Sequence, residues 1–391
     1  MPTFSGSLNS NHIFAALYNM IISQTVFADN IQSGYGSLVD KARVDGSLYG
    51  DTKLYYATDV LKTRSWGADS EATNLLAINR PKAPEQQALV FDQFRQIDIT
   101  IDNYLSKQAW SNPDSFSSFN AVILGWIRET KRVYDQTLYN SFIGTEESIA
   151  NRHEVEAPIA AAVSGLTGEE AFRVQAETIA QTIADLLVDM RDVSRDFNDY
   201  KFLRSYDVNN IKIIWNAKWK NKITKRDLPT MFHKDGLVDK MDEDYLPKRF
   251  FGRRITSSNI SGLVYDADTN PSGPLTLSGT TYTIHNDSGR LEVRTLSERD
   301  VTVSDTTYHL FPGDRMPSGS TFAIATEGDL YYVDEDIICK VLVKLPPIMS
   351  AFEVGTSFFN ARSLTENHYL TWGYNSLEHL YNYPLITVSA D

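Results

Sequence analysis

The chain has 391 residues, of which 42% are hydrophobic and 22% are charged, and its formal net charge is −13. This composition argues against a disordered chain, because there is enough apolar material to fill a sizeable core. The acidic balance argues against a DNA-groove reader, which normally carries a basic surface.

Cysteine and histidine usage gives no sign of a metal centre. Cys339 is the only cysteine, so the chain cannot form an internal disulfide or a thiolate zinc site. It lies in the apolar run 337–345, which predicts a buried side chain and fits synthesis in a reducing cytoplasm. The seven histidines include no pair spaced four residues apart, as a zinc-binding helix requires. We therefore expect no metal and no cofactor.

Residues 1–46 predict an N-terminal arm that contains one amphipathic helix. The helix spans residues 12–28, and its aliphatic face includes Ile13 and Leu17. Polar residues interrupt this stretch and it is too short to span a bilayer, so we expect no membrane segment. Its apolar face must pack against the core of the chain or against a neighbouring molecule.

Residues 47–110 predict an extended loop built as a β-hairpin. Runs at 53–61 and 88–104 have strand composition, and the second run alternates apolar with polar residues. Between them lies a polar stretch that contains Pro81 and Pro84. A loop that projects from the body of a protein usually contacts another molecule or a functional site.

Residues 111–252 predict two long helices and a buried strand. In the segment 114–143, apolar residues recur at the spacing of one helical face. The segment 167–203 has the most regular periodicity in the chain, which predicts a second long helix that packs on the core. Residues 208–215 follow as a strand candidate.

Residues 253–335 differ in composition from the rest of the chain. Ser, Thr, Gly and Asp become more frequent, the helical spacing disappears, and turn dipeptides separate short alternating runs such as 301–309. This pattern predicts a small all-β subdomain inserted into the fold. Residues 336–391 return to apolar strands and one short helix, which we expect to complete the core.

The sequence indicates no catalytic constellation. Asp239, Asp242, Glu243 and Asp244 form an acidic cluster, but general acid–base catalysis needs two carboxylates in contrasting environments. Basic residues flank the cluster, which favours a solvated face or an ion-pair surface between subunits. The chain also lacks a phosphate-binding loop and a Gly-x-Ser-x-Gly elbow. We therefore predict no catalytic residue.

The order of these predicted elements resembles the Hong Kong 97-type fold of major capsid proteins from tailed bacteriophages. Local segments are similar to those of small podoviral capsid proteins: Ile211–Ala217, Lys222–Ile223, Leu228–Pro229, Met231–His233, Phe359–Glu366, Leu370–Tyr374 and Pro384–Ile386. The resemblance implies an α+β fold with an N-terminal arm, an extended hairpin loop, a long spine helix, and peripheral and axial domains.

The resemblance also implies a structural protein rather than an enzyme. Many copies of the chain would self-assemble into hexamers and pentamers of an icosahedral head, through the large interfaces typical of obligate assemblies. The head would enclose double-stranded DNA without sequence-specific binding, and portal and scaffolding proteins would be further partners. The chain would be synthesised in the cytoplasm of the host bacterium and would reside in the virion capsid.

In that family the arm and the extended loop reach across neighbouring subunits, and aromatic side chains commonly anchor interfaces. The candidate inter-subunit contacts are Ile13, Leu17, Tyr55, Tyr56, Trp66, Phe91 and Phe94. For the aromatic residues of the loop, packing within the hairpin itself is the alternative.

Two other functions remain as alternatives. The chain could be another virion component or an adhesion protein that binds carbohydrate through the segment 253–335. It could also be a hydrolase that uses Asp242 and Glu243 together with the aromatic residues between positions 215 and 251.

Overall fold

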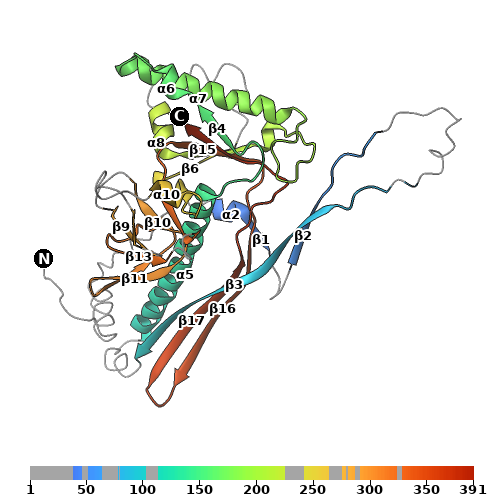
Figure 1. Ribbon diagram of the computed structural model, residues 1–391. Coiled ribbons are helices and arrows are strands. Elements are labelled where there is room, and N and C mark those ends of the chain that lie inside the picture. Colours follow the sequence, from blue (N-terminus) through green and yellow to red (C-terminus); the bar gives the residue numbers. More distant parts are fainter. Residues whose placement is uncertain are drawn as a thin grey trace. The chain divides into compact units, whose positions relative to one another are not determined.

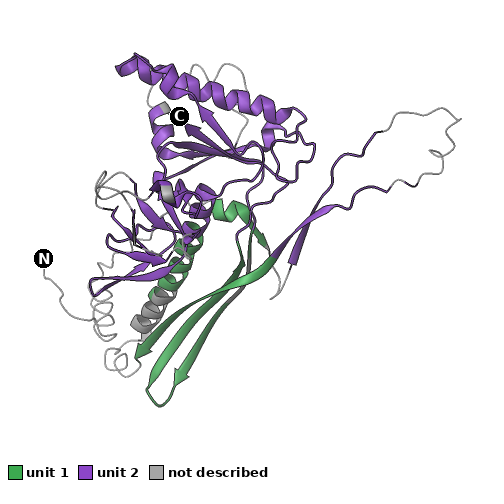
Figure 2. Ribbon diagram, in the orientation of Figure 1, with its two compact units in different colours: residues 1–51, 90–136, 348–376 green, residues 52–89, 137–347, 377–391 purple. Residues whose placement is uncertain are grey.

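The computed structural model of the protein describes residues 38–45, 52–63, 78, 80–102, 113–224, 242–263, 275–278, 281–286, 291–323 and 328–391. The chain forms two compact units, each assembled from three separate stretches (Figure 2). Unit 1 comprises residues 1–51, 90–136 and 348–376, and unit 2 comprises residues 52–89, 137–347 and 377–391.

Unit 1 is built on long strands (Figure 1). Two of them form an antiparallel hairpin, a third pairs antiparallel with it, and a short strand extends it in parallel on the other side. In chain order these are β1 (Arg43–Asp45), β3 (Glu85–Asp102), β16 (Ile348–Asn360) and β17 (Thr365–Asn375). The strand order of the whole sheet is β1-β16-β17-β3-β2, where β2 spans Thr52–Ala57.

A glycine on β17 makes room for the largest buried side chain of β3. Phe91 is only 2% exposed, and its ring lies where a Cβ at Gly373 would be. Any larger residue at position 373 must displace this ring or the strand itself. The pairing of β3 with β17 therefore depends on this contact as well as on the ladder of hydrogen bonds.

The long helix α5 (Pro113–Thr145) is where the periodicity of residues 114–143 predicts it. Its residues up to 136 belong to unit 1 and the remainder to unit 2. Within unit 1, the Tyr134 ring packs edge-on against Trp372 at 5.9 Å, and its hydroxyl lies 2.8 Å from the Tyr374 hydroxyl. These contacts fix α5 against β17. The short helix α2 (Leu38–Ala42) precedes β1.

Unit 2 contains a second sheet, covered by a helix. The strand order is β4-β18-β15-β5-β6. The strands are β4 (Glu154–Ala157), β5 (Lys212–Asn216), β6 (Asp242–Leu246), β15 (Ile337–Leu342) and β18 (Leu385–Ala390). Helix α7 (Gly168–Arg191) packs Ile179, Ile183 and Leu187 into one cluster with buried strand residues, including Cys339. Because both faces of β5 and β15 are buried, these strands are continuous apolar runs interrupted only by paired polar residues.

The second long helix is shorter than its sequence pattern predicts. The apolar stripe continues to position 203, but α7 ends at Arg191 because Asp192 adopts an extended conformation (φ −74°, ψ 155°). Phe197 is nevertheless buried in the same core, from the irregular segment that follows. Phe197 therefore lies at the spacing of the α7 core face although it is not part of the helix. The short helices of this unit are α6 (Ile159–Ala162), α8 (Ala217–Thr224), η1 (Val208–Asn210) and η2 (Lys248–Phe250).

Residues 252–333 also belong to unit 2 and carry three small sheets, with orders β10-β14-β7, β13-β9-β8 and β11-β12. Their elements are β7 (Gly252–Arg254), α10 (Ile260–Leu263), β8 (Leu275–Ser278), β9 (Thr281–Ile284), β10 (Val293–Thr295), β11 (Arg299–Val303), β12 (Thr306–Leu310), β13 (Thr321–Ala323) and β14 (Leu330–Val333). A separate apolar cluster around Tyr282 and Ile284 supports them. That this segment is an insertion stays a prediction.

Two local predictions fail here and in the segment that follows. The run 301–309 is not one strand, because Ser304 and Asp305 both have positive φ and form the tight turn between β11 and β12. In residues 336–391, whose backbone is described throughout, strands and turns replace the expected short helix.

Candidate assembly surfaces

The extended hairpin is fastened to unit 2 at its root. Just beyond β2, the Asp59 carboxylate accepts hydrogen bonds from the Arg195 guanidinium at 2.7 Å and from the Leu203 amide at 3.0 Å. The bond from Arg195 is the main reason why the pKa of Asp59 falls to about 2. The carboxylate is therefore ionised at any physiological pH and holds the strand end in place.

The strands of the hairpin carry two further attachments. The Lys344 ammonium lies over the rings of Tyr55 and Tyr383, at 4.9 and 5.3 Å from their centroids. At the start of β3, buried Gln87 donates to the carbonyl of His379 at 2.6 Å and accepts from the Tyr381 amide at 3.2 Å. Both strands of the hairpin are thus anchored by contacts within unit 2.

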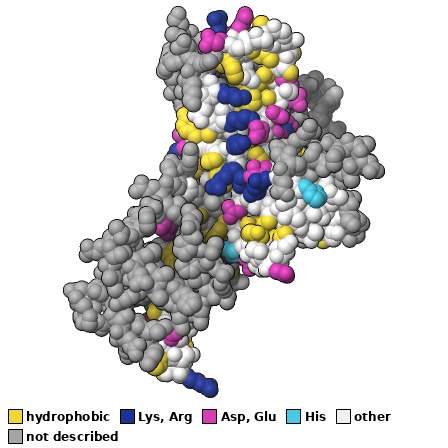
Figure 3. All heavy atoms as spheres, turned by 90° about the vertical axis from the view of Figure 1, so that its left-hand side faces the viewer, with side chains coloured by type: hydrophobic (Ala, Val, Ile, Leu, Met, Phe, Trp, Pro, Cys, Tyr) yellow, Lys and Arg dark blue, Asp and Glu magenta, His cyan; other side chains and the backbone are white. Residues whose placement is uncertain are grey.

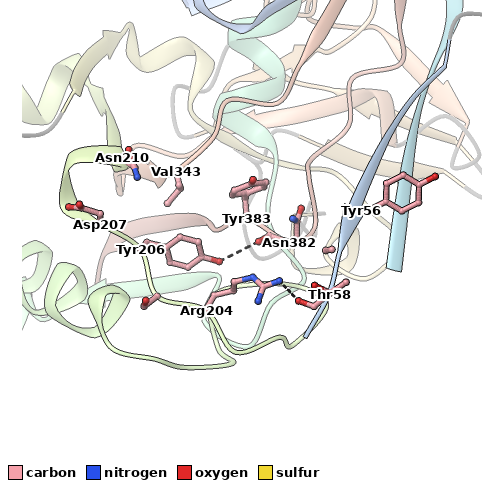
Figure 4. Close-up of a pocket in the computed structure, with 11 residues that line it drawn as sticks. Tyr56, Thr58, Arg204, Tyr206, Asp207, Asn210, Val343, Asn382 and Tyr383 are labelled. Carbon is pink, nitrogen blue, oxygen red and sulfur yellow. Dashed lines mark hydrogen bonds between the residues drawn. The ribbon is translucent and has the colours of Figure 1, made fainter. Parts of the chain in front are cut away.

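A pocket of about 410 Å³ lies beside this root, between the end of β2 and the segment 204–210 (Figure 4). The Arg204 guanidinium donates to the Thr58 carbonyl, and the Tyr206 hydroxyl donates to the Asn382 carbonyl at 3.3 Å. Burial raises the pKa of Tyr206 to about 12, so its hydroxyl stays a neutral donor. These hydrogen bonds join groups that line the pocket, and the one from Arg204 to Thr58 is a further attachment of the hairpin to unit 2.

Away from the roots, the long strands expose large apolar side chains. The clearest case is the turn end of the β16–β17 hairpin, where Phe358 is 61% and Phe359 is 49% exposed. Hairpin strands that leave such residues in water are normally stable only when something covers them. The exposed apolar residues of the long strands are Leu54, Tyr56, Val90, Phe94, Val354, Phe358 and Phe359, with Leu364 beyond the turn.

The structure separates the predicted contact residues into three groups. Tyr56 and Phe94 are 59% and 40% exposed, and Tyr55 is half-buried under Lys344. Phe91 is buried in its own unit, with its ring against Gly373 of β17 and 5.2 Å from the ring of Phe94; its role as a contact between subunits stays a prediction. The remaining three, Ile13, Leu17 and Trp66, lie outside the described residues.

Sequence reasoning did not single out Phe358 and Phe359 as contacts. The available signal was the pair of adjacent aromatic residues beside the polar segment 360–363. In a strand, adjacent side chains point to opposite faces, so the two rings lie on different faces of the sheet. The two-sided exposure of a hairpin end cannot be read from alternation alone, because alternation assumes one buried face.

The acidic cluster proposed for a hydrolase is engaged in ion pairs. Lys212 binds Asp242 at 2.7 Å and also contacts Asp244, while Lys220 binds Glu243 at 2.8 Å. These lysines hold three carboxylates on or beside the edge strand β6, which is the arrangement of a charged surface. Asp239 lies outside the described residues.

Most of the aromatic residues proposed for a hydrolase between positions 215 and 251 are not accessible to a substrate. Trp215, Trp219, Phe250 and Phe251 are buried, whereas Tyr245 is exposed and donates to Glu243; Phe232 lies outside the described residues. Among the described residues, no group of three His, Cys, Asp or Glu side chains is placed to hold a metal ion. None of the helices in the described part of the chain combines the length and apolarity needed to cross a bilayer.

Comparison with known proteins gives a match at the level of structure alone. No family model and no curated protein matches the sequence. A chain in the capsid structure of Staphylococcus phage Andhra is similar with a TM-score of 0.55 and 10% identity, over 100% of this chain and 88% of that chain. A chain in the structure titled as the head fiber and inner core protein gp22 of native bacteriophage P68 is similar with a TM-score of 0.52 and 11% identity, over 99% of this chain and 88% of that chain.

These likenesses confirm the fold class that the sequence predicts. The chain is a mixed α and β protein with the Hong Kong 97-type fold of phage capsid proteins. Because the sequences are only 10–11% identical, the similarity shows the fold and not the function. The function has to be argued from the surfaces of the chain itself.

Proposed function

We propose that the protein is the major capsid protein of a tailed bacteriophage. Copies of the chain self-assemble into hexamers and pentamers, and these form the icosahedral head that encloses the double-stranded DNA genome. On this proposal the chain has no catalytic role. It is synthesised in the host cytoplasm, resides in the virion capsid, and has portal and scaffolding proteins as further partners.

The observation that carries the proposal is a capsid fold whose long strands leave large apolar side chains in water. Phe358 and Phe359 are exposed at the turn end of the β16–β17 hairpin, and Tyr56 and Phe94 are exposed on the β2–β3 hairpin. Apolar side chains of this size are usually covered by a partner. Neighbouring copies of the same chain would supply that cover.

The alternative functions have less support from the described residues. A hydrolase would need the carboxylates Asp242 and Glu243 to be available, and both are paired with lysines. An adhesion protein would use residues 252–333, in which Tyr308 is the exposed large hydrophobic side chain among the described residues. Neither alternative accounts for the exposed hairpins.

Assembly of the purified full-length chain tests the proposal. We expect the wild-type protein to form large closed particles, seen by negative-stain electron microscopy and by sedimentation velocity. The variant Phe358→Ser/Phe359→Ser should need about tenfold or more protein to form them, because it removes apolar cover from the interface. Ile149→Ser is the matched control, since it removes an exposed apolar residue from a loop of unit 2. A wild-type chain that remains monomeric at high concentration would falsify the proposal.

A further inference from the structure

One face of unit 2 carries cations in a chain that is otherwise acidic. Helix α8 has three lysines and no carboxylate in eight residues. Lys218 and Lys222 are four residues apart, a spacing that brings like charges together on a helix and destabilises it. Lys248 and Arg249 on η2 add two more exposed cations. We define the basic face as Lys218, Lys222, Lys248 and Arg249.

The described carboxylates near the basic face do not neutralise it. Lys218 and Lys248 share the single carboxylate of Glu335, at 3.0 Å from Lys248. These two hydrogen bonds lower the pKa of Glu335 to about 2, so it is fully ionised and already engaged. Asp336 interacts electrostatically with Lys222. In the part of the chain that the structure describes, the four cations of the basic face therefore face these two carboxylates.

Lys222 and Arg249 are held by aromatic rings instead of by acids. The Lys222 ammonium lies 4.3 Å from the centroid of the Trp219 ring, and the Arg249 guanidinium lies 4.6 Å from that of Phe250. Both rings are buried, so each cation is positioned without losing its charge. Partial burial, followed by repulsion from Lys218, lowers the pKa of Lys222. An added anion would relieve this crowding of positive charge.

Figure 3 shows the molecule from the side on which α8 lies in Figure 1, and Lys and Arg side chains gather there in a column. The whole chain has a net charge of −13, so the surface away from the basic face is more acidic than the average. Exposed carboxylates such as Glu170 in the first turn of α7 and Asp185 in its middle could contact another molecule. The best complement to the basic face is therefore a second copy of the chain.

We propose that the basic face binds an acidic surface of a neighbouring copy and thereby sets the geometry of the ring. This inference rests on the proposed function and names one of the contacts that it requires. A basic face cannot pair with itself across a two-fold axis, because the like charges repel. The contact is therefore heterologous, with different surfaces on the two copies, and heterologous contacts close into rings such as pentamers and hexamers.

Carbodiimide cross-linking of assembled particles tests the contact directly, because this reagent joins only amines and carboxylates already in contact. Particles would be built from an equal mixture of ¹⁴N- and ¹⁵N-labelled full-length chains, so that mass spectrometry separates links between copies from links within one copy. We expect mixed-isotope links from Lys222, Lys248 or Lys218 to aspartate or glutamate. Lys340, which is fully buried in the sheet of unit 2, is the internal control and should give none.

Charge reversal gives a second, independent readout. Lys222→Glu/Arg249→Glu should raise the protein concentration needed for particle formation about tenfold or more, and wild-type assembly should weaken as salt increases. Arg132→Glu reverses an exposed cation on α5 that is bound to Glu129 of the same helix, and it should assemble as the wild type does. Circular dichroism and the melting temperature must match between variants, since the substituted side chains are exposed.

The outcomes separate this inference from the proposed function. Particles that form equally well from wild type and from the reversed variant, or that lack mixed-isotope links at these lysines, overturn the inference and leave the proposed function intact. Normal assembly of the reversed variant with loss of duplex DNA binding would assign the basic face to nucleic acid and also overturn it. Failure of the wild-type chain to assemble at all contradicts the proposed function itself.

Discussion

Lys340 donates a 2.7 Å hydrogen bond to the hydroxyl of Thr387, its direct neighbour across β15 and β18. Both side chains are buried in the sheet of unit 2, and the Lys340 ammonium also donates to the Glu146 carbonyl at 3.0 Å. An ammonium group in the middle of a packed sheet tolerates burial only if its donors are satisfied. Burial nevertheless lowers the pKa of Lys340 to about 8.

We expect Lys340 to make the stability of the protein depend on alkaline pH. Between about pH 8 and 10.5 the unfolded chain keeps a proton on this lysine that the folded chain has lost, so the free energy of unfolding rises with pH. The slope should approach about 1.4 kcal/mol per pH unit for one proton. Urea titrations across this range should show that Lys340→Met removes this rise, whereas Lys82→Met, at an exposed lysine, preserves it. Parallel curves for wild type and Lys340→Met would contradict the prediction.

The root of the extended hairpin should loosen when Asp59 is changed. Asp59→Ala removes the acceptor of the Leu203 amide, so we expect that amide to exchange with solvent deuterium faster than in the wild type. Asp59→Asn keeps an acceptor oxygen but loses the charge, and should give an intermediate rate. Asp192→Ala, which removes an exposed carboxylate at the end of α7, should leave the exchange unchanged.

The same carboxylate predicts acid sensitivity of the hairpin root. Its folded-state pKa is lowered from 3.8 to about 2, so its contribution is fully present above pH 3.8 and is lost as the pH falls through 2. The protection factor of the Leu203 amide, which corrects its exchange rate for the intrinsic effect of pH, should therefore fall only in this acidic window. A fall already at pH 5 would show that another group controls the root.

His309 should titrate above the usual range for histidine. It lies opposite Asp300 in the β11–β12 ladder, with its Nδ1 2.6 Å from that carboxylate and its Nε2 3.0 Å from Glu298. The bond with Asp300 is the main cause of its raised pKa, so the stabilisation is present below pH 6.5 and disappears as pH rises through the folded-state value. NMR titration of the His309 ring protons should show a pKa above 6.5. Asp300→Asn should return the pKa toward 6.5, and an unchanged titration would exclude Asp300 as the cause.

Gly373 should be intolerant of even one added methyl group. Gly373→Ala forces a Cβ into the ring of Phe91, and overpacking of this kind costs about 1–3 kcal/mol in the free energy of unfolding. Phe91→Leu should recover part of the loss in the double variant, as a double-mutant cycle measured by urea unfolding would show. Gly355→Ala on the partner strand β16 is the control, because the space around a Cβ there is open. Equal effects at the two glycines would count against the proposed contact.

Sequence periodicity located the main helices because their core faces are long and regular. Ile179, Ile183 and Leu187 sit at the spacing of one helical face and are buried as expected. The end of α7 was not predictable from the same signal, because Phe197 reaches the core from irregular chain. A pattern of burial reports which residues face the core, and it does not report whether the backbone between them remains helical.

The contact surfaces were harder to predict than the fold. Phe91 and Phe94 are equivalent in sequence, yet one is buried and the other exposed. The Phe91 ring fills the space beside Gly373, which is more than 250 residues away in the sequence. Local sequence contains no record of such a pairing. The exposed pair Phe358 and Phe359 escaped prediction for a related reason, since only the complete sheet shows which strand segments lack a covering layer.

The interleaved order of the two units has a consequence for synthesis. Unit 1 requires residues 348–376, and the sheet of unit 2 requires β18, which lies between β4 and β15. A nascent polypeptide therefore completes neither unit until that unit's own late segment has been translated, however many of the earlier strands and helices have already formed.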